Sequence, residues 1–135
     1  MHETTELGRA CEHAERRREI GRDLLVARRD VAQFDLHIKQ IEMGIRAGIV
    51  AETTEEGKPL FSNDVKRDAE FIARAGGNAA LGKLKTDRDE REFQAGMMAL
   101  DTQFHADMVR ILCAFAEASQ EQNDGQNGRH TAANL

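Results

Sequence analysis

The chain contains few of the large aromatic side chains that globular proteins bury in their cores. Of its 135 residues, six are phenylalanine, and tryptophan and tyrosine are absent. Alanine, isoleucine, leucine, methionine and arginine carry the apolar and charged content instead, which is typical of coiled coils and helical hairpins. A chain of this length forms at most one domain, and its composition predicts an all-helical domain that need not be globular.

Cysteine, proline and long apolar runs are also scarce. Cys11 and Cys113 lie outside any Cys-x-x-Cys motif, so we expect free thiols in a reducing, cytoplasmic setting, with a disulfide between them as the alternative. Pro59 is the one proline, and because proline interrupts helices we expect two long helical arms joined near it. No run of about 18 apolar residues is present and the N-terminus is polar, so we expect neither a membrane span nor a signal peptide.

Charged residues are plentiful, but neither sign dominates strongly. They make up 32% of the chain, and the formal net charge is −5. Proteins that coat nucleic acid are more often basic, so the net charge argues against that role for the chain as a whole. A local basic patch remains compatible with it.

An unbroken heptad pattern occupies the first half of the chain. Nine positions from Ile20 to Gly48, among them Ala27, are spaced alternately four and three residues apart. This spacing keeps one seam of a helix facing a partner helix along its whole length. We therefore predict a long helix over about 5–51 that needs a partner from the same chain or from a second copy. The candidate self-association residues on this seam are Ile20, Leu24, Val31, Phe34, Ile38, Ile41 and Ile45.

The second half of the chain is predicted to contain a loop, a short helix and a second long helix. Gly57 and Pro59 mark the loop, and Ser62, Asn63 and Asp64 are candidate N-caps for a helix over about 64–75. Gly76-Gly77-Asn78 is expected to end that helix, and a second long helix is expected over about 79–119. These elements form a domain over 1–119. The remaining segment, 120–135, is rich in Gln, Asn and Gly, and we expect it to be a disordered tail.

The apolar residues of the second long helix follow a different period from those of the first. Several pairs, such as Phe93 with Phe104 and Phe104 with Phe115, are eleven residues apart, which indicates a nearly straight stripe. Residues 83–92 are almost wholly charged, and we expect them to be the weakest part of this helix. The predicted stripe consists of Phe93, Met97, Leu100, Phe104, Met108, Ile111, Phe115 and Ala118.

Two long helices joined by a short connection favour an antiparallel, coiled-coil-like hairpin. Such a hairpin buries little surface for each residue, so apolar residues outside the seam are expected to be covered by a second copy. We therefore predict a dimer that forms a helical bundle. The residues expected to be left for the second copy include Leu25, Leu36, Met43, Met98 and Leu112.

A run of arginines in the first helix is the strongest candidate for binding a partner protein or nucleic acid. Such a strip could contact phosphate groups. The alternative is a solvated helix face that is neutralised by the acidic residues interleaved with it, namely Glu12, Glu15, Glu19 and Asp23. The candidate binding residues are Arg16, Arg17, Arg18, Arg22, Arg28 and Arg29.

Metal binding and catalysis have weak support in the sequence. The histidines form no His-x-x-x-His motif. Folding the arms together could bring His13 near His105 or Cys113, and a cluster of these residues with Cys11 would suit Zn²⁺. We expect unrelated polar residues instead, and we assign no metal or cofactor. Asp101 and His105 are a single pair rather than the repeated Glu-x-x-His motif of carboxylate-lined bundle sites, and we expect no enzymatic activity.

Residues 57–69 carry the one family resemblance. Their sequence, Gly-Lys-Pro-Leu-Phe-Ser-Asn-Asp-Val-Lys-Arg-Asp-Ala, resembles a pattern in small phage and prophage accessory proteins, where a Gly-Lys turn leads through an aromatic-Ser-Asn cap into a Lys-Arg helix. The order of elements is similar over about 20–116, although the sequence departs from the pattern at Gly76-Gly77. The resemblance implies a mobile-element origin and a role beside DNA recombination or replication, and it assigns no catalytic residue.

Three functions are compatible with these features. The first is a non-enzymatic helical interaction protein that self-associates and docks a partner protein. The second is a nucleic-acid-binding accessory protein that uses the arginine strip. The third is a protein that sequesters a small ligand or nucleotide in a pocket between protomers.

Overall fold

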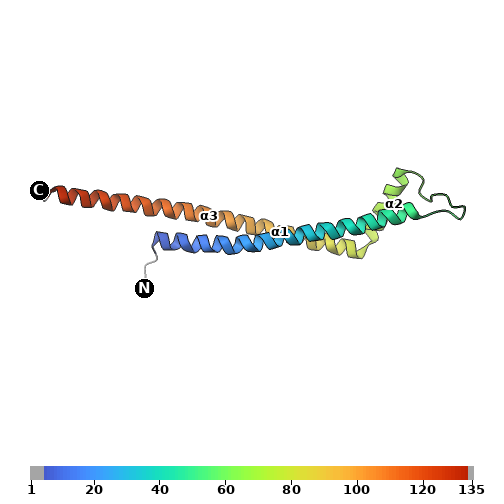
Figure 1. Ribbon diagram of the computed structural model, residues 1–135, viewed down its shortest axis with the longest axis horizontal. Helices are drawn as coiled ribbons and strands as arrows, with labels where there is room; N and C mark the ends of the chain where they lie inside the picture. The colour runs from blue at the N-terminus through green and yellow to red at the C-terminus, as the bar shows by residue number, and fades with distance from the viewer. Residues whose placement is uncertain (1–4, 134–135) are drawn as a thin grey trace. The chain divides into compact units, whose positions relative to one another are not determined.

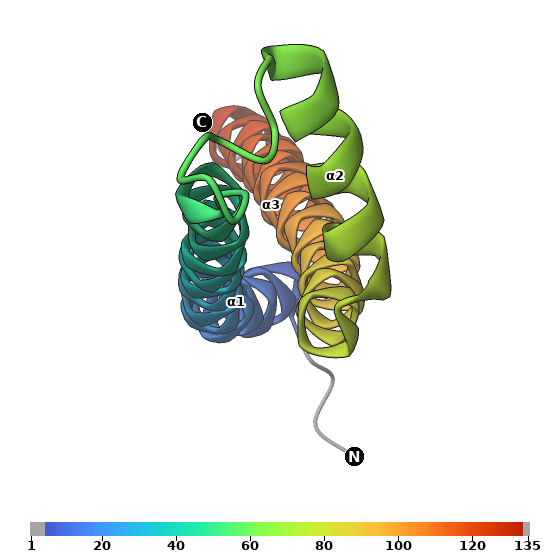
Figure 2. The same ribbon diagram turned by 90° about the vertical axis from the view of Figure 1, so that its right-hand side faces the viewer.

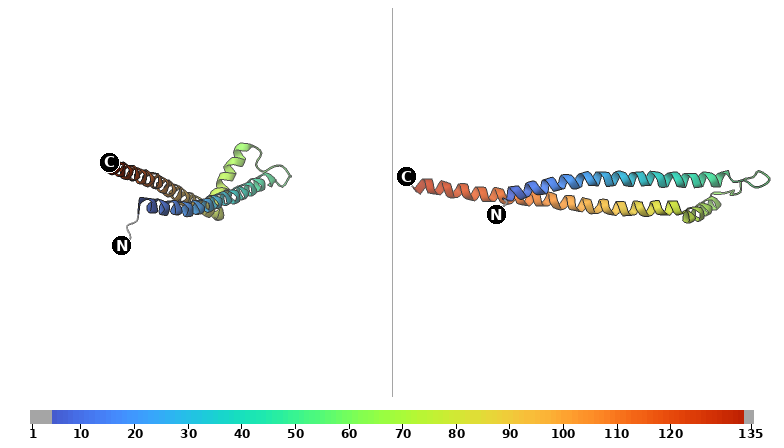
Figure 3. Two further views of the ribbon diagram at one scale, coloured as in Figure 1. Left: turned by 60° about the vertical axis from the view of Figure 1, so that its left-hand side comes forward. Right: turned by 90° about the horizontal axis from the view of Figure 1, so that it is seen from below.

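The computed structural model describes residues 5–133 and is all-helical, as the sequence predicts. It contains α1 (Glu6–Ala51), α2 (Asp64–Gly77) and α3 (Ala79–Ala133). The long helices α1 and α3 run antiparallel and pack against each other, and α2 connects them, so the fold is a helical hairpin (Figures 1 and 3). Two compact units make up the chain. We call residues 26–95 the loop unit, and residues 5–25 with 96–133 the terminal unit.

Side-chain caps place the helix starts close to where the sequence predicts them. The Thr5 hydroxyl oxygen accepts a hydrogen bond from the Gly8 amide at 3.1 Å, and the Asn63 side-chain oxygen accepts one from the Lys66 amide at 2.9 Å. Each bond satisfies an amide that has no partner within its helix. Of the three candidate caps for α2, Asn63 is therefore the one used.

Asn78 separates α2 from α3 and serves both helices. Its amide donates to the Ala75 carbonyl at 3.2 Å, while its side-chain oxygen accepts from the Leu81 amide at 2.9 Å. Its backbone is extended, with φ −85° and ψ 105°. Gly76 and Gly77 remain in α2, so the break predicted around Gly76-Gly77-Asn78 occurs at the asparagine.

The loop between α1 and α2 is a closed turn rather than a loose connection. Thr53 and Pro59 form an isolated antiparallel bridge, and the Thr54 amide donates to the Lys58 carbonyl at 2.7 Å. Gly57 turns the chain with φ +79°, a conformation that side chains disfavour. Figure 2 views the molecule from this end, with α2 labelled beside the turn.

Ion pairs and a cation–π contact attach α2 to the end of α1. The Arg74 guanidinium binds both carboxylate oxygens of Glu52, at 2.7 and 2.9 Å, and also binds Glu70 at 2.7 Å. The hydrogen bond from Arg74 lowers the pKa of Glu52, and the bond to Glu52 raises the pKa of Arg74. Arg46 lies 3.9 Å from the ring centre of Phe71. These contacts fix α2 within the loop unit.

The heptad seam of α1 is confirmed over most of its length. Ile20, Leu24 and Ala27 are buried, and the seam residues from Val31 to Ile45 are half-buried. Gly48 is exposed, and Ile49, which is 1% exposed, occupies the last seam position. The candidate self-association residues therefore lie on the contact between α1 and α3 within one chain.

The α3 side of this contact differs from the prediction. Most residues of the predicted eleven-residue stripe are exposed. The less exposed positions of α3 follow a heptad instead, with alternating steps of three and four. Several of them are small, polar or charged, so a search for apolar periodicity does not detect them. They are Leu81, Leu84, Arg88, Arg91, Ala95, Met98, Thr102, His105, Val109, Leu112 and Ala116.

Only some of the residues that were expected to be covered by a second copy are exposed in the structure. Leu25, Leu36 and Met43 are exposed, at 66%, 54% and 59%. Leu112 is buried and Met98 is half-buried, so these two belong to the seam within the chain.

The charged stretch 83–92 joins the helices rather than weakening α3. Arg88 contacts Asp35 at 2.8 Å, Arg91 contacts Asp30 at 2.8 Å, and Lys85 contacts Glu42 at 3.3 Å. The hydrogen bond to Asp35 is the main reason that the pKa of Arg88 is raised. All three pairs connect α3 to α1, so they fix the register of the loop unit.

The segment after Ser119 also differs from the expected disordered tail. Helix α3 continues to Ala133 and extends past the N-terminal end of α1 within the terminal unit (Figure 3). Residues 120–129 are exposed throughout. The segment lacks proline, and it continues a helix that is already nucleated, so each added residue needs only the propagation step.

Candidate functional site

The terminal unit has a row of exposed apolar side chains along α3, which we call the α3 stripe. Its members are 44–66% exposed although they are large and apolar. Large apolar residues that recur every three or four positions form one continuous helix face, and such a face usually marks an interaction site. The α3 stripe consists of Met97, Leu100, Phe104, Ile111 and Phe115.

The surroundings of the α3 stripe are poor in charge. Between residues 93 and 118 only Asp101, Asp107, Arg110 and Glu117 are charged, whereas eight of the ten residues in 83–92 are. Asp107 and Arg110 pair with each other at 3.2 Å. A helix that is apolar over most of its circumference is normally buried, so this part of α3 has the composition of a covered helix and the exposure of an uncovered one.

The arginine strip of α1 forms few close ion pairs with the acidic residues interleaved with it, among the described residues. Arg16 pairs with Glu19 at 3.0 Å. Within residues 5–133, Glu12, Glu15 and Asp23 form no ion pair, and the interpretation of a solvated, neutralised helix face stays a prediction. Exposed pairs on one helix are worth only about 0.3–0.5 kcal/mol, which is easily lost to solvation. The strip residues that are exposed and form no ion pair with any described residue are Arg17, Arg18, Arg22, Arg28 and Arg29.

The structure brings His13 and His105 together, although the sequence led us to expect unrelated polar residues. Their Nδ1 atoms lie 2.7 Å apart, and both residues are half-buried. The Phe104 ring meets both imidazoles edge-on, with ring centres 6.1 Å and 5.2 Å apart. The histidine pair therefore lies in the terminal unit, beside the α3 stripe.

The larger metal cluster considered from the sequence does not form. Cys11 is exposed, Cys113 is half-buried, and both are free thiols. Across the part of the chain that the structure describes, no group of three or more His, Cys, Asp or Glu residues could hold a metal ion. The described residues also contain no hydrogen bond between Asp101 and His105, the pair considered for acid–base chemistry. The side chains of His2 and His130 lie outside the described residues.

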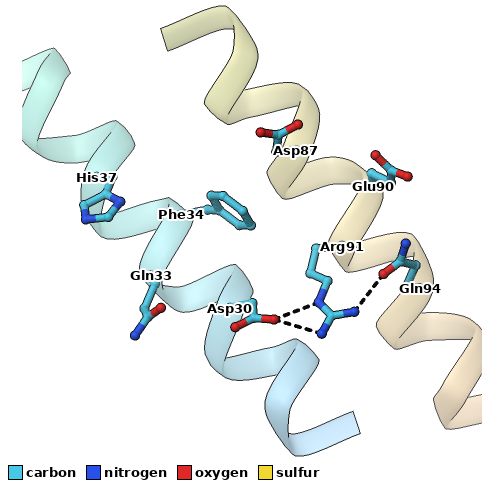
Figure 4. Close-up of a pocket in the computed structure, with 8 residues that line it drawn as sticks. All are labelled: Asp30, Gln33, Phe34, His37, Asp87, Glu90, Arg91 and Gln94. Atoms are coloured by element: carbon cyan, nitrogen blue, oxygen red, sulfur yellow. Dashed lines mark hydrogen bonds and ion pairs between the residues drawn. The ribbon is translucent and has the colours of Figure 1, made fainter. Parts of the chain in front are cut away.

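A polar groove of about 370 Å³ lies between α1 and α3 in the loop unit (Figure 4). Its arginine, Arg91, is already bound to Asp30 and, at 2.8 Å, to Gln94. Asp87 and Glu90 line the groove from the same helix. A nucleotide needs free positive charge for its phosphates, and among the described residues the arginine that lines the groove is already paired and no lysine lines it, so the groove gives no support to nucleotide sequestration.

Comparisons with protein-family models, with curated proteins and with solved structures find no match to this chain. The resemblance of residues 57–69 to phage accessory proteins therefore stays a prediction. Over the described residues, no helix combines the length and the apolar character needed to cross a membrane.

Proposed function

We propose that this chain is a non-enzymatic helical interaction protein that self-associates through the α3 stripe. The observation that carries the proposal is the exposure of five large apolar residues on a segment of α3 that is nearly free of charge. Contact with water is unfavourable for such an apolar surface. Burial of this surface against a partner is favourable by about 25 cal/mol of free energy for each Å².

The spacing of the stripe favours a second copy of the chain as its partner. Leu100 and Met108 lie four residues to either side of Phe104, and Met97 and Ile111 lie seven to either side. In a two-fold symmetric contact, each residue meets its counterpart from the other end of the same surface. Two α3 helices that pack antiparallel about Phe104 therefore bring apolar residues together at every one of these positions.

The size of the stripe is also close to what a dimer needs. At roughly 100 Å² for each half-exposed large side chain, five residues provide roughly 500 Å² in each chain. Two copies would bury about 1,000 Å², near the lower bound for a specific interface. The exposed arginines of α1 remain available to a partner protein in such a dimer.

Analytical ultracentrifugation of Leu100→Asp and Leu25→Asp tests this proposal. Both leucines lie in the terminal unit and both are 66% exposed, but only Leu100 belongs to the stripe. We expect the wild type and Leu25→Asp to sediment as dimers at micromolar concentration, and Leu100→Asp to dissociate at least tenfold more readily. A monomeric wild type, or equal weakening by both substitutions, would overturn the proposal.

The unpaired arginines support nucleic-acid binding as a second candidate function. Arginines that neutralise phosphates release counterions, so binding weakens steeply as salt increases. Fluorescence anisotropy with a DNA duplex at low salt tests this candidate. Replacing Arg17 and Arg18 with alanine should weaken binding and flatten its salt dependence, whereas replacing the paired Arg16 should do so less. Undetectable binding at low salt would exclude this function.

A further inference from the structure

The histidine pair brings together two imidazole nitrogens from residues 92 positions apart in the sequence. His13 lies on α1 and His105 on α3, and the 2.7 Å distance joins their Nδ1 atoms. At this distance one Nδ1–H donates to the lone pair of the other Nδ1. Both Nδ1 atoms are thus directed into the same small space, one with a lone pair and the other with a proton that must move to its own Nε2 before a metal ion can bind both.

The separation of these nitrogens is close to that of two adjacent ligands on one metal ion. Imidazole nitrogens bind zinc at about 2.0–2.1 Å. Two such ligands at a right angle lie about 2.9 Å apart, and tetrahedral ligands lie about 3.3 Å apart. An opening of a few tenths of an ångström, a turn of the rings and the shift of the donor's proton from Nδ1 to its own Nε2 therefore convert the hydrogen-bonded pair into a pair of metal ligands.

The surroundings of the pair define which ions suit it. Among the described residues no third His, Cys, Asp or Glu completes a cluster with it, so water must supply the remaining ligands. Neutral imidazoles favour zinc, copper and nickel, whereas magnesium and calcium prefer oxygen ligands. The half-buried position of both residues leaves access for the ion and for its water ligands.

We propose that His13 and His105 form a binding site for a divalent transition-metal ion that joins α1 to α3 in the terminal unit. A ligand that binds only the folded protein stabilises it according to its concentration and affinity. Because this ion would bridge two helices, its binding is coupled to the folding of the terminal unit. This site differs from the α3 stripe in its residues and in its chemistry, so either proposal can fail without the other.

The test compares two variants that divide the five histidines of the chain into opposite sets. The first variant replaces His2, His37 and His130 with alanine and keeps only the pair. The second replaces His13 and His105 and keeps the other three. Each is titrated with ZnCl₂ in isothermal calorimetry, and its thermal midpoint is followed by circular dichroism, with MgCl₂ as the control ion.

We expect the variant that keeps the pair to bind one zinc ion for each chain and to gain about 5–10 °C at a hundredfold excess over the dissociation constant. The variant that lacks the pair should show neither effect, and magnesium should change neither variant. The inference is overturned if the variant without the pair retains the zinc response, or if the wild type has none.

A measurement on the wild-type protein keeps the inference testable if a variant does not fold. Cu²⁺ added at one equivalent should give an electron paramagnetic resonance spectrum with hyperfine coupling to two imidazole nitrogens. A spectrum with only oxygen ligands would overturn the inference.

Discussion

The loop unit and the terminal unit use the same two helices in different ways. In the loop unit three ion pairs connect α1 with α3, and two residues, Ile49 and Leu81, are 1% exposed. In the terminal unit, as far as the structure describes it, the side-chain hydrogen bonding between α1 and α3 is limited to the histidine pair, and large apolar side chains of α3 face solvent. Both units expose large apolar side chains, but the loop unit adds ion pairs between its helices, whereas the terminal unit carries five exposed apolar residues along one face of α3 that a partner can cover.

The largest expected effect comes from the core of the loop unit. Replacing Leu81 with alanine should lower the free energy of unfolding by about 2–4 kcal/mol, because the cavity left behind cannot collapse completely. Leu100→Ala, made at an exposed position, is the control and should cost less than about 1 kcal/mol when the chain is monomeric. Urea denaturation measures both. Equal losses would mean that the two units do not differ as described.

The ion pair between Asp30 and Arg91 provides the next test. Asp30→Asn should lower the free energy of unfolding by about 0.5–1 kcal/mol in low salt and by less in high salt, which screens the charges. Asp107→Asn removes a pair that lies within one turn of α3 and should cost less. Urea denaturation at two salt concentrations distinguishes these results. If Asp107→Asn lowered the free energy of unfolding as much as Asp30→Asn, the ion pair between helices would have no special role in the register of α1 against α3.

The pH dependence of the loop unit should follow Glu52. Because Arg74 lowers the pKa of Glu52 in the folded state, this pair stabilises the fold above the ordinary carboxyl pKa. The stabilisation by this pair is lost as the pH falls through the lowered pKa of Glu52. In urea denaturation between pH 7 and pH 3, Glu52→Gln should therefore show a smaller acid-induced loss than the wild type. Glu55→Gln, at a carboxylate without an ion pair in the described structure, should behave like the wild type.

The smallest expected effect on stability concerns the end of α3. A chain truncated after Ser119 should unfold at the same urea concentration as the full chain, because residues 120–129 bury nothing. Its far-ultraviolet circular dichroism should nevertheless lose helical signal in proportion to the residues removed. A truncation that leaves the helical signal unchanged would show that this segment is disordered in solution, as its composition suggests.

Several features of the fold could be predicted because they depend on neighbouring residues. The seam of α1 follows from its heptad spacing, and the caps at Thr5 and Asn63 follow from side chains that reach amides three residues away. The contact between His13 and His105 was considered but not expected, although an antiparallel hairpin brings the start of α1 beside the later part of α3.

The contact face of α3 could not be predicted in the same way. The most regular apolar pattern of this helix suggested the stripe around Phe104, yet the seam passes through Arg88, Arg91 and His105. These polar side chains are favourable in a seam only because Asp35, Asp30 and His13 lie opposite. No pattern within α3 alone carries that information.

The sequence by itself determined where the three helices begin and the seam of α1, because periodicity and short-range hydrogen bonds act over a few residues. Only the tertiary structure decided which face of α3 meets α1, and therefore which apolar residues remain exposed. Burial is a competition between faces of one helix, and its outcome depends on residues of the other helix. The same decision placed the Nδ1 atoms of His13 and His105 2.7 Å apart and left the stripe around Phe104 exposed.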